Sequence, residues 1–234
     1  MTGQDIRITG PAGEFSAYLA KPDSGAGPAV VVLQEIFGVN HVMREMCDRL
    51  AGQGFIAVCP DLFWRLEPGV DITDKTDEEL AKAFDLMGKY NPDTGIEDVQ
   101  ATIDHVRKMD GCNGKVGAIG FCLGGLMAYL TAARTDSDAT VGYYGVNIPN
   151  HLDEAGKISN PLMLHIAGRD EFVPPEAQAA MHAGLDPHRQ VTLHDYPDDE
   201  HAFSRIEGAH YNPESARLAD GRTLDFLKKN LRAD

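Results

Sequence analysis

The chain has 234 residues, of which 43% are hydrophobic and 24% charged, and its formal net charge is −15. A chain of this length buries a large core without disulfides or metals, so we expect one domain over residues 1–234. The negative charge argues against a nucleic acid or an anionic membrane as a partner. The sequence also contains no apolar run long enough to cross a bilayer.

The N-terminal segment and the cysteines predict a location in the cytoplasm. Met1 to Asp5 contain no basic region followed by an apolar one, so we expect no secretory signal. The four cysteines have no paired spacing such as C-x-x-C, and we therefore expect no metal site. Reduced thiols in the cytoplasm are then the simplest interpretation.

Strand and helix patterns alternate from the start of the chain. Two short runs within residues 6–19 flank a Gly-Pro-Ala-Gly turn, which predicts a hairpin at a sheet edge. Continuous apolar runs at 29–33 and 55–59 are typical of strands covered on both faces. A helix is predicted between these two strands, with apolar residues at 43, 46 and 50.

Residues 60–92 interrupt this alternation. Thr76 and Glu79 predict a capping box that opens a helix within the segment. Long excursions at the carboxyl edge of a sheet often carry substrate contacts, so we expect this one to contribute to the substrate pocket. Its acidic residues are interpreted as a solvated face; they are Asp74, Asp77 and Glu78.

The alternation resumes after this excursion, and Asp93 is predicted to cap the next helix. Later strands are predicted at 115–119, 140–145, 161–167 and 191–196, and later helices at 126–133, at 176–185 and from Asn212 onward. Strands that alternate with helices in this way predict an α/β fold with a mostly parallel, doubly wound sheet and helices on both faces.

The segment Gly-Phe-Cys-Leu-Gly-Gly at 120–125 lies between a predicted strand and a predicted helix. This pattern is typical of a nucleophile elbow, in which a strained turn exposes one reactive side chain at a helix N-terminus. Cys122 stands at the nucleophile position, where the helix dipole favours a thiolate. The alternative is a structural cysteine buried beside a tight helix–sheet contact.

Two further loops carry candidate catalytic groups. Asp170 and His201 each follow a predicted strand, and ligands of open α/β sheets bind beyond the carboxyl ends of strands. The order nucleophile, acid, histidine is that of the α/β-hydrolases. In that scheme Cys122 attacks an acyl carbon, His201 serves as its base, and Asp170 orients the histidine. The remaining histidines considered are interpreted as surface groups; they are His165, His182, His188, His194 and His210.

The sequence resembles the dienelactone hydrolase (carboxymethylenebutenolidase) family of the α/β-hydrolase fold over nearly its whole length. The resemblance rests on Gln34-Glu35-Ile36-Phe37-Gly38-Val39-Asn40, Cys59-Pro60-Asp61-Leu62, Gly120-Phe121-Cys122-Leu123-Gly124-Gly125, Tyr143-Tyr144-Gly145, Gly168-Arg169-Asp170 and His201-Ala202-Phe203-Ser204-Arg205.

The resemblance implies roles for residues that pattern alone does not single out. It implies that Glu35 contacts the resting cysteine and takes part in its activation; a solvated or helix-capping glutamate is the alternative. The backbone N–H groups of Ile36 and Leu123 are implied to form the oxyanion hole. Arg205 matches the position that binds a substrate carboxylate.

The expected substrate-binding residues are Arg205, Phe37, Leu80, Phe84 and Met87. The resemblance implies a second arginine and aromatic neighbours after the Asp-Leu-Phe stretch, but Leu80, Phe84 and Met87 stand at those positions. We therefore expect a more apolar pocket wall and a weaker preference for carboxylate-bearing substrates than two arginines would give.

Together these features predict a cysteine-dependent hydrolase of a lactone or small ester, which requires no cofactor and acts as a monomer rather than an oligomer. Two alternatives remain open. One is a carboxylesterase or thioesterase of broad specificity. The other is a non-catalytic protein on the same scaffold that binds a ligand or senses oxidation through Cys122.

Overall fold

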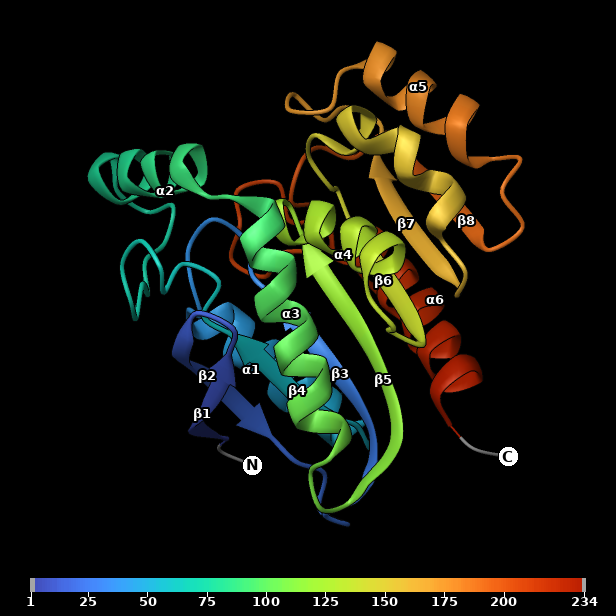
Figure 1. Cartoon of the computed structure of the whole chain (residues 1–234). Helices are drawn as coiled ribbons and strands as arrows, with labels where there is room; N and C mark the ends of the chain where they lie inside the picture. The colour runs from blue at the N-terminus through green and yellow to red at the C-terminus, as the bar shows by residue number, and fades with distance from the viewer. Residues whose placement is uncertain (1–2, 233–234) are drawn as a thin grey trace.

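The computed structural model describes residues 3–232, and an eight-stranded sheet runs through its centre (Figure 1). The ends of the expected 1–234 domain, with Met1 and Thr2 of the N-terminal segment, lie outside the described residues. The strands are β1 (Gln4–Gly10), β2 (Gly13–Ala20), β3 (Gly27–Leu33), β4 (Ile56–Pro60), β5 (Cys112–Phe121), β6 (Ala139–Tyr143), β7 (Leu162–Ala167) and β8 (Val191–Tyr196).

The strand order is β1-β2-β4-β3-β5-β6-β7-β8. β1 and β2 form the predicted antiparallel hairpin at one edge, and β2 pairs antiparallel with β4. All pairs from β4 through β8 are parallel. The parallel strands therefore end along one edge of the sheet, which is the upper edge in Figure 1.

Helices cover both faces of this sheet. They are α1 (His41–Gly52), α2 (Asp77–Lys89), α3 (Pro92–Arg107), α4 (Leu123–Arg134), α5 (Pro175–Leu185) and α6 (Pro213–Leu231), with a 3-10 helix η1 (Ile148–Lys157). In Figure 1, α3 and α4 lie in front of the strands while α1 and α6 lie behind them. The predicted α/β class with a mostly parallel, doubly wound sheet is confirmed.

The core lies between these layers and is most complete around β3, β5 and α4. Every side chain of β3 from Ala29 to Leu33 is fully buried, as its continuous apolar run predicted. Helix α4 is buried from Leu123 to Ala133, because it packs against β5 and β6 on one side and α3 and η1 on the other. The nucleophile elbow is therefore fixed to a fully buried part of the molecule.

Two predicted helix caps differ in detail from the structure. Helix α3 is capped by Asn91, whose Oδ1 accepts from the Asp93 N–H at 2.9 Å, so the assignment of the cap to Asp93 was wrong. Pro92 at the first helical position favours this earlier start. In α2 the Thr76 Oγ1 accepts from the Glu79 N–H at 3.1 Å, as predicted. The Glu79 carboxylate instead accepts a hydrogen bond from Thr73, which leaves the capping box half formed.

The excursion after β4 carries α2, which stands above the carboxyl ends of the strands at the upper left of Figure 1. An isolated antiparallel bridge between Gly38 and Asp71 ties it to the loop that follows β3. Within α2 only Ala83 and Leu86 are buried. The other apolar side chains of this helix are therefore available to line a pocket.

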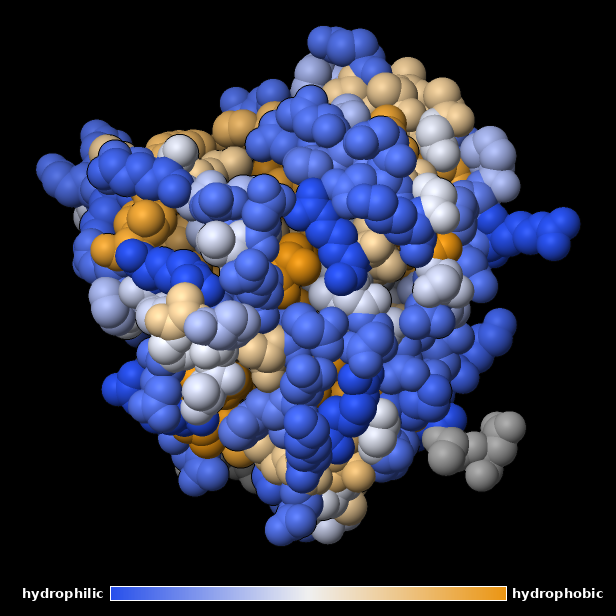
Figure 2. Space-filling view, in the orientation of Figure 1, coloured by the Kyte–Doolittle hydropathy of each residue, from blue (hydrophilic) through white to orange (hydrophobic). Residues whose placement is uncertain are grey.

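The face of the molecule shown in Figure 2 is mostly hydrophilic, in keeping with the net charge of −15. None of the helices in the described part of the chain is long and apolar enough to cross a membrane.

Candidate active site

Cys122 lies at the turn between β5 and α4, where the backbone is strained. Its φ of 55° and ψ of −112° fall in a region that L residues rarely adopt and that is frequent at functional sites. The residue is the N-cap of α4, and its carbonyl accepts hydrogen bonds from the N–H groups of Gly125 and Leu126. The predicted elbow geometry is confirmed, and it holds the thiol at a helix N-terminus.

The glycines after Cys122 let α4 begin very close to the sheet. A Cβ on Gly125 would lie 2.6 Å from the Tyr143 carbonyl oxygen, and a Cβ on Gly124 would collide with the Leu33 carbonyl. Any larger residue would push the helix away from the ends of β3 and β6. The glycines therefore set the position of the thiol relative to the residues that follow β3.

His201 and Asp170 form a buried pair, as the sequence predicted. The distance between His201 Nδ1 and Asp170 Oδ2 is 2.7 Å, and their side chains are 10% and 1% exposed. The second oxygen of Asp170, Oδ1, accepts from the Phe172 N–H at 2.9 Å. Because both carboxylate oxygens are held, the acid fixes the orientation of the imidazole and leaves Nε2 free for the reaction.

The protonation state of His201 follows from its surroundings. Burial lowers its pKa, but the hydrogen bond with the Asp170 carboxylate and the proximity of Cys122 outweigh burial, and the pKa rises from 6.5 to about 10. The imidazole is thus cationic at neutral pH. A cationic imidazole beside a thiol stabilises negative charge on the sulfur, which is the reactive form of a cysteine nucleophile.

Two aromatic side chains, Tyr144 and Phe172, pack against the His201 ring. The Tyr144 ring lies edge-on at 5.0 Å and the Phe172 ring at 4.8 Å between centroids. The Tyr144 hydroxyl also makes a 3.1 Å hydrogen bond with Ser204. The resemblance included the Tyr-Tyr-Gly motif but assigned no role to Tyr144, and Phe172 carried no sequence signal beyond its position just after Asp170.

Ile36 and Leu123, the residues expected to form the oxyanion hole, lie after the end of β3 and at the start of α4. Leu123 is the first residue of α4, and the first N–H groups of a helix have no intrahelical acceptor. Ile36 follows β3, against which the start of α4 packs through Gly124. Within residues 3–232 neither N–H donates to a backbone carbonyl, so both are available to an oxygen that develops charge.

Glu35 is buried in the same site, so the alternative interpretation of a solvent-exposed glutamate is wrong. Its side chain is 3% exposed, and Oε2 accepts a hydrogen bond from Arg205 Nη1 at 3.3 Å. The other oxygen, Oε1, is buried and has no hydrogen-bond partner among the described residues. A buried unpaired carboxylate oxygen is costly, so Oε1 is placed to accept a proton or hydrogen bond inside the site.

Arg205 differs from its expected state because it is already paired. Its Nη2 donates to Asp74 Oδ2 at 2.5 Å, in addition to the bond with Glu35. The Asp74 side chain is only 29% exposed, so its assignment to a solvated acidic face was wrong. Asp77 and Glu78, the other two acidic residues of that segment, are exposed as expected.

These groups line one cavity of about 680 Å³ above the elbow. The predicted pocket residues Phe37, Leu80, Phe84 and Met87 all lie on its wall, with Cys122, His201, Glu35 and Arg205. Phe84 and Phe172 are 44% and 45% exposed, and their ring centroids lie 6.2 Å apart. Part of the cavity wall is therefore apolar, and α2 contributes Leu80, Phe84 and Met87 to it, as expected for residues 60–92.

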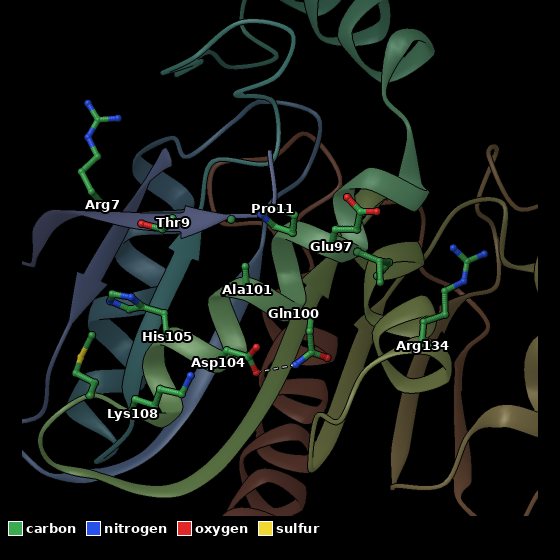
Figure 3. A pocket seen from close by; sticks show the side chains of 13 residues that line it. Arg7, Thr9, Pro11, Glu97, Gln100, Ala101, Asp104, His105, Lys108 and Arg134 are labelled. Carbon is green, nitrogen blue, oxygen red and sulfur yellow. Dashed lines mark hydrogen bonds between the residues drawn. The ribbon is translucent and has the colours of Figure 1, made fainter. Parts of the chain in front are cut away.

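A second hollow of about 850 Å³ lies between β1 and α3 (Figure 3). Its side chains come largely from α3, including His105, and from Lys108 just after that helix. Asp104 accepts a hydrogen bond from Gln100 at 3.0 Å. It is more open than the cavity above the elbow and contains none of the predicted catalytic residues. We therefore do not assign the chemistry to it.

The interpretation of His165 as a surface group is wrong. His165 is 1% exposed, and its ring nitrogens lie 2.8 Å from the Tyr196 hydroxyl and 2.9 Å from the Thr223 hydroxyl. Burial lowers its pKa well below 6.5, so it is a neutral core histidine. The other four are at least partly exposed, and they are His182, His188, His194 and His210. Among residues 3–232 no group of three or more His, Cys, Asp or Glu is placed to hold a metal.

The sheet order, the cysteine elbow and the ordered acid and histidine loops define a protein of the α/β-hydrolase fold. A structure from Klebsiella pneumoniae subsp. pneumoniae, provisionally described as a dienelactone hydrolase, is 26% identical and superposes with a TM-score of 0.87 over 97% of this chain and 98% of that one. An esterase of Pyrococcus furiosus shares the fold at 18% identity, with a TM-score of 0.71 over 97% of this chain and 92% of that one.

The sequence model of the dienelactone hydrolase family matches residues 15–231, and the chain belongs to this family. A protein of Azospirillum brasilense, provisionally named carboxymethylenebutenolidase, is 49% identical over 97% of this chain and 99% of its own. A carboxymethylenebutenolidase of Pseudomonas sp. (strain P51) is 38% identical over 93% of this chain and 91% of its own.

Proposed function

We propose that this protein hydrolyses a lactone or small ester through the triad Cys122, His201 and Asp170. The observation that carries the proposal is the buried 2.7 Å pair of His201 and Asp170 beside a cysteine held at a strained elbow. The names of the curated relatives, carboxymethylenebutenolidases, support a lactone as substrate.

The proposed reaction has two steps. The Cys122 thiolate attacks the substrate carbonyl, and the N–H groups of Ile36 and Leu123 stabilise the oxyanion. His201 donates its proton to the leaving oxygen, and the acyl-enzyme forms. His201 then takes a proton from water, which attacks the thioester and releases the acid. For a lactone, the leaving oxygen stays in the same molecule, so one hydroxy acid is the product.

Glu35 is proposed to assist this cycle through Oε1, which has no partner among the described residues: where Cys122 rests as a thiol, Oε1 accepts the thiol proton as the sulfur attacks and returns it when the thiolate is released. Its pairing with Arg205 through Oε2 fixes the carboxylate and leaves Oε1 without a partner among the described residues. Glu35→Gln should therefore slow acylation more than it lowers substrate affinity. The pH profile of acylation should change as well, because an amide cannot accept the proton.

We further propose that residues 1–234 act as one monomeric domain in the cytoplasm. One continuous cluster of buried side chains, drawn from β1 through α6, supports a single domain. A cysteine nucleophile must stay reduced, and the cytoplasm keeps thiols in that state. Fractionation of the cell of origin and sedimentation of the purified protein are the direct checks.

Pre-steady-state hydrolysis of p-nitrophenyl acetate tests the proposed function. We expect a burst of p-nitrophenol equal to the concentration of active sites, followed by turnover. A broad esterase would give the same burst but no advantage for lactones over open esters of similar size. A burst without turnover would support the non-catalytic alternative, in which Cys122 only binds or reacts.

A further inference from the structure

The guanidinium of Arg205 is enclosed by two carboxylates and one aromatic ring. Nη1 donates to Glu35 at 3.3 Å, Nη2 donates to Asp74 at 2.5 Å, and the Phe37 ring centroid lies 5.2 Å from Cζ. The Arg205 side chain is 14% exposed. Nε is buried and has no hydrogen-bond partner among the described residues. A further carboxylate would therefore compete with Glu35 and Asp74 for the Nη1 and Nη2 groups that they already hold.

The balance of charge in the cavity opposes such a carboxylate. Glu35, Asp74 and Glu171 line the cavity against a single guanidinium, that of Arg205. The imidazolium of His201 is already paired with Asp170. Like charges in a partly desolvated cavity repel more strongly than in water. The site as built therefore carries no uncompensated positive charge that would attract an anion.

Asp74 differs from Glu35 in how firmly it is held. It lies in the segment between Asp71, which bridges to Gly38, and Thr76, which caps α2. The one hydrogen bond of its carboxylate within the described residues goes to Arg205, and 29% of its side chain is exposed, against 3% for Glu35. Asp74 thus occupies the accessible side of the guanidinium, where the carboxylate of a substrate would otherwise bind.

We propose that Asp74 determines the substrate specificity of this site: it occupies Arg205 as a built-in carboxylate, so the site accepts neutral lactones and esters and discriminates against substrates that carry a carboxylate. The inference rests on the hydrolase function proposed above. It replaces the expectation of a residual preference for anions, which treated Arg205 as unpaired.

The apolar part of the cavity wall fits the same class of substrate. Leu80, Phe84, Met87 and Phe172 present apolar surface there, and burying apolar substrate carbons against it contributes roughly 25 cal/mol per Å². A neutral substrate with an apolar acyl chain gains this contact without displacing Asp74. A substrate of the same length that ends in a carboxylate has to lose part of its hydration in a negatively charged cavity.

The test compares two esters of equal chain length, p-nitrophenyl pentanoate and p-nitrophenyl hemiglutarate. We expect the unaltered protein to prefer the neutral ester in kcat/KM by about tenfold or more. Asp74→Asn removes one negative charge and weakens the bond to Nη2, and should raise kcat/KM for the hemiglutarate by roughly ten- to a hundredfold, the range of one charge-assisted contact. The readout is the ratio of the kcat/KM values for the two esters, so a change common to both substrates does not affect it.

Glu171→Gln is the matched control, because it removes the same charge from the same cavity without touching Arg205. We expect it to change the ratio of the two kcat/KM values by no more than about threefold. An equal effect of both substitutions would overturn the role of the Asp74–Arg205 pair. An Asp74→Asn variant with an unchanged ratio would overturn the proposal outright, provided that its thermal unfolding matches that of the unaltered protein.

A binding measurement separates this inference from the proposed function. In the Cys122→Ala background, calorimetry with glutarate should show at least about tenfold tighter binding when Asp74→Asn is added. This outcome does not depend on turnover. Failure of both esters to react would therefore count against the hydrolase function alone, whereas equal glutarate affinity with and without Asp74→Asn would count against the role of Asp74.

Discussion

Asp170 holds His201 with one carboxylate oxygen and the N–H of Phe172 with the other, at 2.7 Å and 2.9 Å. The Phe172 ring in turn packs edge-on against the His201 ring. Acid, backbone and aromatic ring thus form one closed unit around the imidazole. The histidine that serves Cys122 is therefore positioned by a short loop after β7 as well as by its own loop after β8.

The first prediction concerns the acid of this unit. Asp170→Asn should leave the fold nearly unchanged and lower kcat by about a hundredfold or more, because an amide does not stabilise the required tautomer and cation of His201. Steady-state kinetics with circular dichroism as a control would measure this. A loss of only about twofold would point to another acid and would call for the same test at Asp199.

The second prediction concerns Phe172 as a positioning residue. Phe172→Ala removes the ring that packs on His201, and kcat should fall by roughly tenfold through looser orientation of the imidazole. Phe172→Leu keeps an apolar side chain there and should restore most of the rate. If both variants changed KM alone and left kcat intact, Phe172 would be only a wall of the substrate cavity.

The third prediction concerns stability at alkaline pH. The pKa of His201 is about 10 in the folded protein, above its ordinary value of 6.5. A raised pKa means that its stabilisation is fully present below about pH 6.5 and is lost as pH rises through about 10. The melting temperature should therefore fall between these limits more steeply in the unaltered protein than in His201→Gln. If the melting temperatures of the unaltered protein and of His201→Gln fell equally with pH across this range, the raised pKa of His201 would be contradicted.

The fourth prediction concerns the wall that lacks an arginine. Leu80→Arg adds a cation to the apolar part of the cavity wall, and it should raise the preference for p-nitrophenyl hemiglutarate over the pentanoate by about tenfold. Combined with Asp74→Asn, the two effects should add if the two positions act independently. Met87→Leu, at the same wall, keeps the charge unchanged and should leave the preference near its original value.

The sequence predicted the parts of this molecule that short-range patterns control. Continuous apolar runs located the buried strands, and a glycine on each side of Cys122 located the elbow, because only those patterns fit a covered sheet and a strained turn. The order of Cys122, Asp170 and His201 then placed three loops at one edge of the sheet. The resemblance contributed Glu35, whose buried position no local pattern indicates.

Other features depend on contacts between distant segments. Asp74 looked like one of several solvated acidic residues, and only the approach of Arg205, far along the chain, makes it part of the site. His165 looked like a surface group because its partners Tyr196 and Thr223 come from β8 and α6. The local sequence around Asp74 and His165 does not predict their pairing, because their partners come from distant segments that only the tertiary fold brings close.

The most direct test of the account is the mass of the acyl-enzyme. After rapid mixing with p-nitrophenyl acetate and acid quenching, peptide mass spectrometry should find one acetyl group, on Cys122. It should find none on the partly exposed Cys112 or on the buried Cys47 and Cys59. The adduct should decay as product forms, and Cys122→Ala should show neither adduct nor turnover. Acetylation of another residue, or turnover that survives Cys122→Ala, would contradict the central claim.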